Sequence, residues 1–251
     1  MTVSTRILTA TTMAFRDQRR RPLLLILLVI LPAYVITRSI AITEPTPQDV
    51  GLPGGTVTAS NMRDIHGAVM GGTIIGFAAG LVGVFVMQSA LQGDRRLVIA
   101  GFRPGEAIIA RLLVVAAATG LVVAVSAIVT ALAFDPASWI PFLAGLLLIG
   151  LIYAALGALI GAVLDKLAAT YLILFVVMTD VSIVQNPMFG DGTPDGWAVV
   201  LPGYGPSRLM VDGAFSSSFH AGGELALSLA WTAALSAAVL VVLKRAVGQR
   251  T

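Results

Sequence analysis

Few residues in this chain have the types and spacing that catalysis or metal binding requires. The two histidines, His66 and His220, cannot form a His-Glu-x-x-His zinc site. The sequence has no cysteine, which excludes disulfides, thiol catalysis and zinc-thiolate sites. It also contains no Gly-x-x-x-x-Gly-Lys-Ser/Thr phosphate loop and no Gly-x-Ser-x-Gly elbow. Asp165 and Asp180 would stand about 22 Å apart along one helix, too far to act as a carboxylate pair. We therefore expect no enzyme activity and no cofactor in this chain.

The composition is that of an integral membrane protein. Hydrophobic residues make up 57% of the chain and charged residues 12%, far fewer than a soluble surface needs. The formal net charge of only +3 makes nucleic-acid binding a poor explanation of the basic balance. Six apolar runs are long enough to cross a bilayer as helices. They predict an all-α protein with six transmembrane helices at 23–42, 67–91, 112–134, 140–164, 167–184 and 226–243.

The basic residues predict the orientation of these helices. With the N-terminus in the cytoplasm, 13 of the 16 basic residues fall on the inner side, and the outer side keeps Arg38, Arg63 and Arg208. The positive-inside rule therefore favours a multi-pass protein of the cell membrane with both termini cytoplasmic. The first apolar run is longer than the core of a typical signal peptide, so we expect it to be a membrane span.

Three connecting segments carry further expectations. Residues 1–21 mix apolar and basic residues at helical spacing, which is typical of an amphipathic helix on the inner leaflet, although a disordered basic tail would share this composition. Residues 43–65 contain prolines and a glycine pair and are expected to be irregular. The outer segment 185–225 is broken by proline and glycine, and we expect either short interfacial or re-entrant helices at 197–201 and 209–215 or a plain loop.

The inner segment 92–107 has a pattern of its own. We expect a short helix, a turn, and a second helix opened by Pro104 with Glu106 in its first turn, where negative charge is favoured. Such a surface could dock a cytoplasmic partner, whereas an ordinary solvated loop would also explain its arginines. Asp165 and Lys166 predict a tight cytoplasmic turn between the fourth and fifth spans.

Within the spans, glycines recur at four-residue spacing, while charges are almost absent. Such small residues let helices approach closely, mainly within the chain and in part across a dimer. The helix-packing candidates are Gly72, Gly76, Gly80, Gly157 and Gly161. Arg38 and Asp180 lie near outer ends, where we expect them to reach the interface. The lack of acidic residues at mid-membrane depth counts against a proton-coupled carrier.

The order of these elements resembles the membrane (permease) subunit of type-2 ABC exporters. The likeness rests on the basic N-terminal segment, on residues 102–111 leading into the third span, and on the broken outer segment. Within that segment, residues 201–208 (Leu-Pro-Gly-Tyr-Gly-Pro-Ser-Arg) look like the Leu-Pro-x-Tyr region that precedes the last span in the family. The chain departs from the family at 93–96, where Gly-Asp-Arg-Arg replaces an acidic residue and a Gly-Thr pair.

The resemblance implies a single permease domain over 1–251, with a bundle at 22–243 and a cytoplasmic tail at 244–251. It implies a second permease copy or paralogue, a separate ATPase subunit that carries ATP and Mg, and export of a lipophilic or amphipathic compound. The expected ATPase-coupling residues are Asp94, Arg95, Arg96, Arg103, Glu106, Asp165 and Lys166. The alternatives are an ATP-independent channel or ion-coupled carrier, and a membrane scaffold without transport.

Overall fold

A computed structural model describes residues 22–99, 104–132, 134–189, 194 and 196–248, together with Thr9 and Thr12. Most of this chain is helical. The helices are α2 (Pro22–Ile42), α3 (Met62–Ile99), α4 (Pro104–Ala131), α5 (Trp139–Val163), α6 (Lys166–Val177), α7 (Tyr204–Phe215) and α8 (Gly222–Gly248). Two strands, β1 (Pro47–Gly51) and β2 (Val57–Asn61), lie between α2 and α3. A π-helical segment, Met178–Val184, continues α6, and a 3-10 helix spans Gly196–Val200.

The fold is that of a multi-pass helical membrane protein. Five helical stretches of the described chain are long and apolar enough to cross a bilayer, which confirms the predicted class. They are Met62–Ser89, Ile109–Ala131, Trp139–Val163, Lys166–Val184 and Gly222–Arg245. The first predicted span corresponds to α2, of which the apolar stretch Leu28–Ile42 is fully described, and five helices meet these criteria among the described residues.

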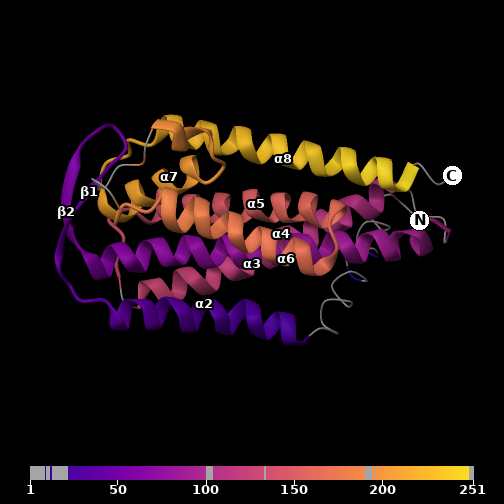
Figure 1. Ribbon diagram of the computed structural model, residues 1–251, viewed down its shortest axis with the longest axis horizontal. Coiled ribbons are helices and arrows are strands. Elements are labelled where there is room, and N and C mark those ends of the chain that lie inside the picture. The colour runs from indigo at the N-terminus through magenta and orange to yellow at the C-terminus, as the bar shows by residue number, and fades with distance from the viewer. Residues whose placement is uncertain are drawn as a thin grey trace.

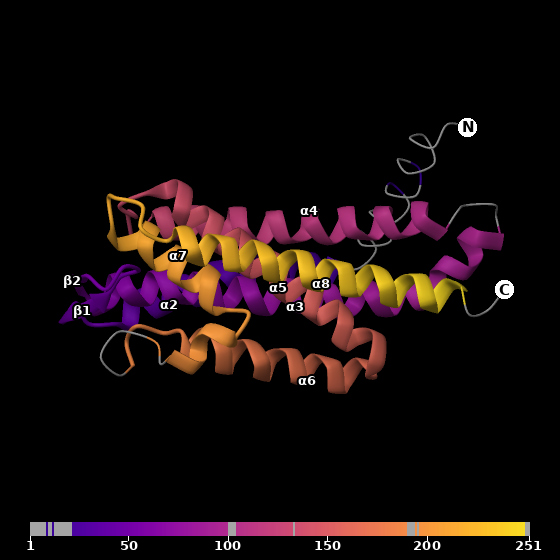
Figure 2. The same ribbon diagram turned by 90° about the horizontal axis from the view of Figure 1, so that it is seen from above.

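Two helices form the centre of the bundle. Figure 1 shows α2 and α8 on opposite sides of α3 and α5, and the view turned by 90° in Figure 2 shows α4 and α6 on the other two sides. Burial agrees with this arrangement, since 72% of the most apolar stretch of α3 is buried against 17% in α8. The peripheral helices therefore expose apolar side chains that only lipid or another membrane protein can cover.

Glycines allow the two central helices to touch through their backbones. A Cβ atom added at Gly157 of α5 would overlap the carbonyl oxygen of Gly80 on α3, and one added at Gly83 would overlap that of Ala154. A Cβ at Gly161 would lie 2.9 Å from the Cα of Val84. Because these contacts involve backbone atoms, no side-chain rotation could relieve the overlap, and the glycines are what permits the close crossing.

The remaining helix-packing candidates on α3 face side chains of α5, α6 and α7. A Cβ at Gly72 would lie 3.0 Å from Cδ1 of Ile149 and 3.1 Å from the sulfur of Met210. A Cβ at Gly76 would lie 3.2 Å from Val177. The glycine stripe therefore lies inside this chain, against several neighbouring helices at once.

The short helix α7 is inserted among the long ones. Its residues from Gly205 to Ala214 are all buried. A Cβ at Gly145 of α5 would lie 2.6 Å from the backbone nitrogen of Met210, so α7 packs against α5 at backbone distance. The backbone N–H of Ser138 donates to the carbonyl of Gly213 over 2.8 Å, which fixes the turn before α5 to the end of α7. With 12 residues, about 18 Å, α7 cannot span a bilayer.

Two connecting segments differ from the sequence prediction. Residues 43–65 were expected to be irregular, but β1 and β2 pair as antiparallel strands. The turn between the strands places Gly54 and Gly55 at φ of 87° and 81°, a region that side chains disfavour. The expected separate helix after residue 92 is the continuation of α3, which runs unbroken to Ile99. Pro104 begins α4 as predicted.

The strands mark one end of the bundle, which we call the hairpin end. The α4–α5 turn, α7 and the start of α8 lie at this end, and the end of α3, the start of α4 and the α5–α6 turn lie at the opposite end (Figure 1). The N-terminal segment 1–21, apart from Thr9 and Thr12, lies outside the described residues, so its predicted amphipathic helix stays a prediction.

The glycine crossing yields a first test. We expect Gly157→Ala to lower the midpoint of thermal unfolding, because the new methyl group meets the α3 backbone at a cost of about 1–3 kcal/mol. Gly120→Ala on α4 is the matched control, since a Cβ there has no neighbour within 4 Å. It should leave the midpoint unchanged or raise it, since Ala is favoured over Gly in helices by up to ~1 kcal/mol. Thermal unfolding of both variants is followed by tryptophan fluorescence in one detergent. Equal shifts of the unfolding midpoint in the two variants would contradict the packing role of Gly157.

Candidate functional site

The residues predicted to couple to an ATPase gather at the end opposite the hairpin. Asp94, Arg95 and Arg96 lie in the last turns of α3, and Glu106 lies in the first turn of α4. Arg103 lies outside the described residues. The α5–α6 turn, with Asp165 and Lys166, is at the same end (Figure 1). The structure thus brings the two predicted coupling segments to one end of the bundle.

The α5–α6 turn is tied to α3 and to its own helix. The Asp165 carboxylate accepts hydrogen bonds from the backbone N–H groups of Leu167 and Ala168, at 2.9 and 3.1 Å, and so caps α6. The Lys166 ammonium lies 4.9 Å from the ring centroid of Phe85 on α3. Gln88 of α3 donates to the Leu164 carbonyl over 3.3 Å. A displacement of α3 at this end would therefore act on the α5–α6 turn.

A buried polar network occupies the other end of the bundle, centred on Asp180 in the π-helical segment. Asp180 is only 3% exposed. Its Oδ2 accepts hydrogen bonds from the Tyr153 hydroxyl at 2.5 Å and from the Gly203 backbone N–H at 2.9 Å. Its Oδ1 accepts from the Gln185 amide at 3.1 Å. Three separate segments of the chain thus converge on one carboxylate, which satisfies its need for donors in an apolar surrounding.

The π-helical segment also holds the α6 end against α3. The Ser182 hydroxyl donates to Thr73 Oγ1 over 3.0 Å, and the Asn186 amide donates to the Ser182 carbonyl over 3.0 Å. π-Helical turns are uncommon and are often found at functional sites. Here the wider turn directs Asp180 towards α5 and Ser182 towards α3, so both central helices are joined to the last turns of the fifth span.

Segment 201–208 contains two glycines, Gly203 and Gly205, that allow close packing at this end of the bundle. A Cβ at Gly203 would lie 2.7 Å from both Asp180 Oδ1 and the Tyr153 hydroxyl, so only glycine fits there. A Cβ at Gly205 would lie 2.6 Å from the carbonyl oxygen of Glu224, which brings α7 against α8. The segment therefore allows the outer part of the chain to fold back into the bundle.

Arg208 joins α7 to the strands. Its guanidinium donates to the Gly51 carbonyl over 2.6 Å, and the residue is only 6% exposed. Burial lowers the pKa of Arg208 from its ordinary value, while Tyr204, Glu224 and Asp212 act in the opposite direction. One helical turn further on, the Asp212 carboxylate accepts from the backbone N–H of His220 at 2.9 Å, which fixes the connection to α8.

Sequence reasoning was wrong about the surroundings of Asp180. We expected its carboxylate to reach the membrane interface from the outer end of the fifth span. The structure instead encloses it between α5, the π-helical segment and the turn before α7. An acidic residue inside an apolar run was the available signal, since such residues are usually buried and functional. Tyr153 carried no sequence signal, because Asp180 lies 27 residues further along the chain. Gln185 is only five residues from Asp180, but no motif marks it as a donor to that carboxylate.

No family model matches the chain, and no curated protein matches it. Within the part of the chain that the structure describes, no three histidine or acidic residues lie together in a way that could hold a metal ion. The function must therefore be argued from the arrangement of the helices and their charged ends.

The Asp180 network yields a second test. We expect Tyr153→Phe to destabilise the protein by about 1–3 kcal/mol, because it removes a donor to a buried carboxylate and leaves the ring in place. Tyr171→Phe is the control, since Tyr171 is 64% exposed on α6 and its hydroxyl removal should cost less than ~0.5 kcal/mol. Thermal unfolding of both variants in one detergent measures the difference. Equal stability of the two would show that the hydrogen bond to Asp180 contributes nothing.

Proposed function

We propose that this chain is the permease subunit of an ATP-binding cassette exporter, and that it pairs with a second permease and couples to a separate ATPase. The observation that carries the proposal is the length of α3. Its 38 residues correspond to about 57 Å, whereas the apolar core of a bilayer needs about 30 Å. The apolar sequence of this helix ends at Leu91, and the last turns carry Asp94, Arg95 and Arg96.

These last turns and the start of α4 form a charged projection beyond the membrane spans. In α4, Pro104 and Glu106 lie in the first turn, and the apolar residues follow from Ala107. The projection belongs to α3, the most buried helix of the bundle, so force applied to it would act on the core rather than on a peripheral helix. The contacts of Lys166 and Gln88 would carry the same movement to the α5–α6 turn. This is the arrangement that a subunit driven by an external motor requires.

The charges support an orientation with this projection in the cytoplasm. Six basic residues of the described chain lie at the projecting end: Arg95, Arg96, Arg111, Lys166, Lys244 and Arg245. The hairpin end has three basic residues, Arg38, Arg63 and Arg208, among more numerous acidic ones. The positive-inside rule then places the projecting end and both termini in the cytoplasm of a cell-membrane protein. On this topology α2, which has 21 residues, is the sixth span.

The transported compound in this proposal is lipophilic or amphipathic, and it moves along a path between two permease copies or paralogues. The exposed apolar faces of the peripheral helices support both parts, because they suit neutral cargo and a second membrane subunit equally. ATP and Mg belong to the partner ATPase. Closure of the partner ATPase acts on this chain because the ATPase binds the two conformations of the permease with different affinities.

One observation favours a second candidate, an ion-coupled carrier. Asp180 is a buried acid within a membrane-spanning helix, the kind of group that such carriers use to bind a proton or cation. A structural role suits Asp180 better, because three donors of the chain itself already satisfy its carboxylate. Asp180 also lies four residues before the end of the π-helical segment. Transport by purified chain in vesicles without ATP, abolished in Asp180→Asn, would favour the carrier.

The orientation can be tested by labelling, because the chain has no cysteine of its own. We expect Val57→Cys, at an exposed position in β2, to react with a membrane-impermeant maleimide in intact cells. Lys166→Cys, in the α5–α6 turn, should react only after permeabilisation. The reverse pattern of labelling would overturn the proposed topology.

The coupling role can be tested by charge reversal at the projection. We expect Arg95→Glu with Arg96→Glu to lower substrate-stimulated ATPase activity of the assembled complex about tenfold, equivalent to a loss of roughly 1.4 kcal/mol. Membrane insertion should be unaffected. Arg63→Glu at the hairpin end is the matched control and should retain activity, because it lies at the other end of α3. Normal ATPase activity in the double variant would exclude the docking role.

A further inference from the structure

A cavity of about 250 Å³ lies inside the chain between α3, α4, α5 and α8. It exists because small residues line it where larger ones would fill the space, among them Ala154, Ala155 and Ala158. An apolar cavity of roughly 150 Å³ is enough to take up benzene in another protein. The space therefore suits part of an apolar molecule, and it is too small for a whole amphiphile.

The cavity is long and narrow and runs along the bundle. On α8 its lining extends from Thr232 to Leu243, twelve residues that cover about 16 Å along the helix axis. Apart from Arg111, its polar lining residues are Thr232 and Ser236. The Thr232 hydroxyl donates to the Ser228 carbonyl over 2.8 Å and so is already satisfied within α8. The lining thus favours a flexible hydrocarbon chain over a ligand with polar groups along its length.

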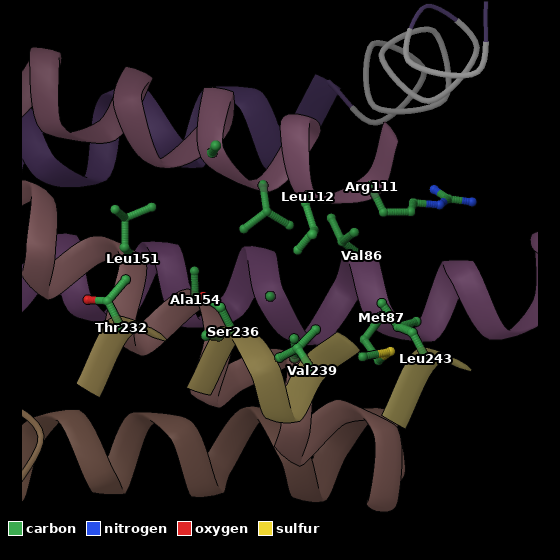
Figure 3. A pocket seen from close by; sticks show the side chains of 15 residues that line it. Val86, Met87, Arg111, Leu112, Leu151, Ala154, Thr232, Ser236, Val239 and Leu243 are labelled. Atoms are coloured by element: carbon green, nitrogen blue, oxygen red, sulfur yellow. The ribbon is translucent and has the colours of Figure 1, made fainter. Parts of the chain in front are cut away.

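Basic side chains lie at one end of the cavity. Figure 3 shows the Arg111 side chain on α4 with its guanidinium directed away from Leu151 and Thr232, towards the end where Leu243 lies. Lys244 and Arg245 follow Leu243 directly and are exposed. A negatively charged group attached to the chain in the cavity would therefore meet basic side chains at this end.

We infer that this cavity binds part of one acyl chain of an anionic phospholipid, with the phosphate of that lipid against Arg111 at the projecting end of the bundle. An elongated apolar slot and a basic rim together match a hydrocarbon chain joined to an anionic headgroup. The site lies within a single chain, so neither a second permease nor an ATPase is required to form it. If the proposed orientation holds, the projecting end places this lipid in the inner leaflet, and only that placement rests on the proposed function.

The test measures lipid retained by the purified full chain. The probes are palmitoyl-oleoyl phosphatidylglycerol and the zwitterionic phosphatidylcholine with the same chains, each quantified by native mass spectrometry after identical purification. We expect Ser236→Phe, which fills the slot from α8, to reduce retained phosphatidylglycerol at least fivefold. Ala237→Phe is the matched control, because Ala237 is the exposed next residue of the same helix and should leave retention unchanged.

Two further variants make the result decisive. Ala155→Leu fills the cavity from α5 with a smaller side chain and decides the question if Ser236→Phe does not fold. Arg111→Gln should reduce the preference for phosphatidylglycerol over phosphatidylcholine while retaining binding of both. The inference is overturned if folded Ser236→Phe retains as much phosphatidylglycerol as the parent chain, or, where that variant does not fold, if Ala155→Leu does. It is also overturned if the parent chain retains the two lipids equally. These outcomes do not depend on ATPase activity and leave the exporter proposal untouched.

Discussion

The backbone contact between α3 and α5 is the constraint on which the rest of the structure depends. Gly83, Gly157 and Gly161 have no side chains that would keep these helices apart. In a membrane, where water does not drive helices together, such close van der Waals contact is a main source of association. The other four long helices then pack around this pair, and their exposed faces are left for lipid or for a second subunit.

The two ends of the central pair serve different purposes. At the hairpin end, Tyr153 of α5 and Thr73 of α3 hold the π-helical segment, and the turn at Gly203 folds α7 into the bundle. At the projecting end, the last turns of α3 carry Asp94, Arg95 and Arg96, and Lys166 and Gln88 tie the α5–α6 turn to α3. One end is therefore fixed by buried polar contacts, while the other offers a charged surface. This asymmetry suits a protein that is moved from one side.

Much of this arrangement could be predicted from the sequence because membrane spans depend on local composition. Hydropathy placed the spans from 67 to 243 close to their observed helices, and Pro104 marked the start of α4. The strands after α2 were missed, since their pairing depends on a turn with two glycines at positive φ rather than on alternating hydrophobicity. The enclosure of Asp180 was missed because two of its three donors, Tyr153 and Gly203, lie 27 and 23 residues away in the chain. Such long-range polar contacts leave no periodic pattern.

The most direct measurement is an affinity purification of the chain from its native membrane, with identification and quantification of the proteins that accompany it. The account predicts a separate ATPase with a phosphate loop, recovered in stoichiometric amount and lost when Arg95 and Arg96 are reversed to glutamate. Recovery of the chain without an ATPase, under conditions that preserve other membrane complexes, would contradict the exporter proposal and favour an ATP-independent channel or carrier.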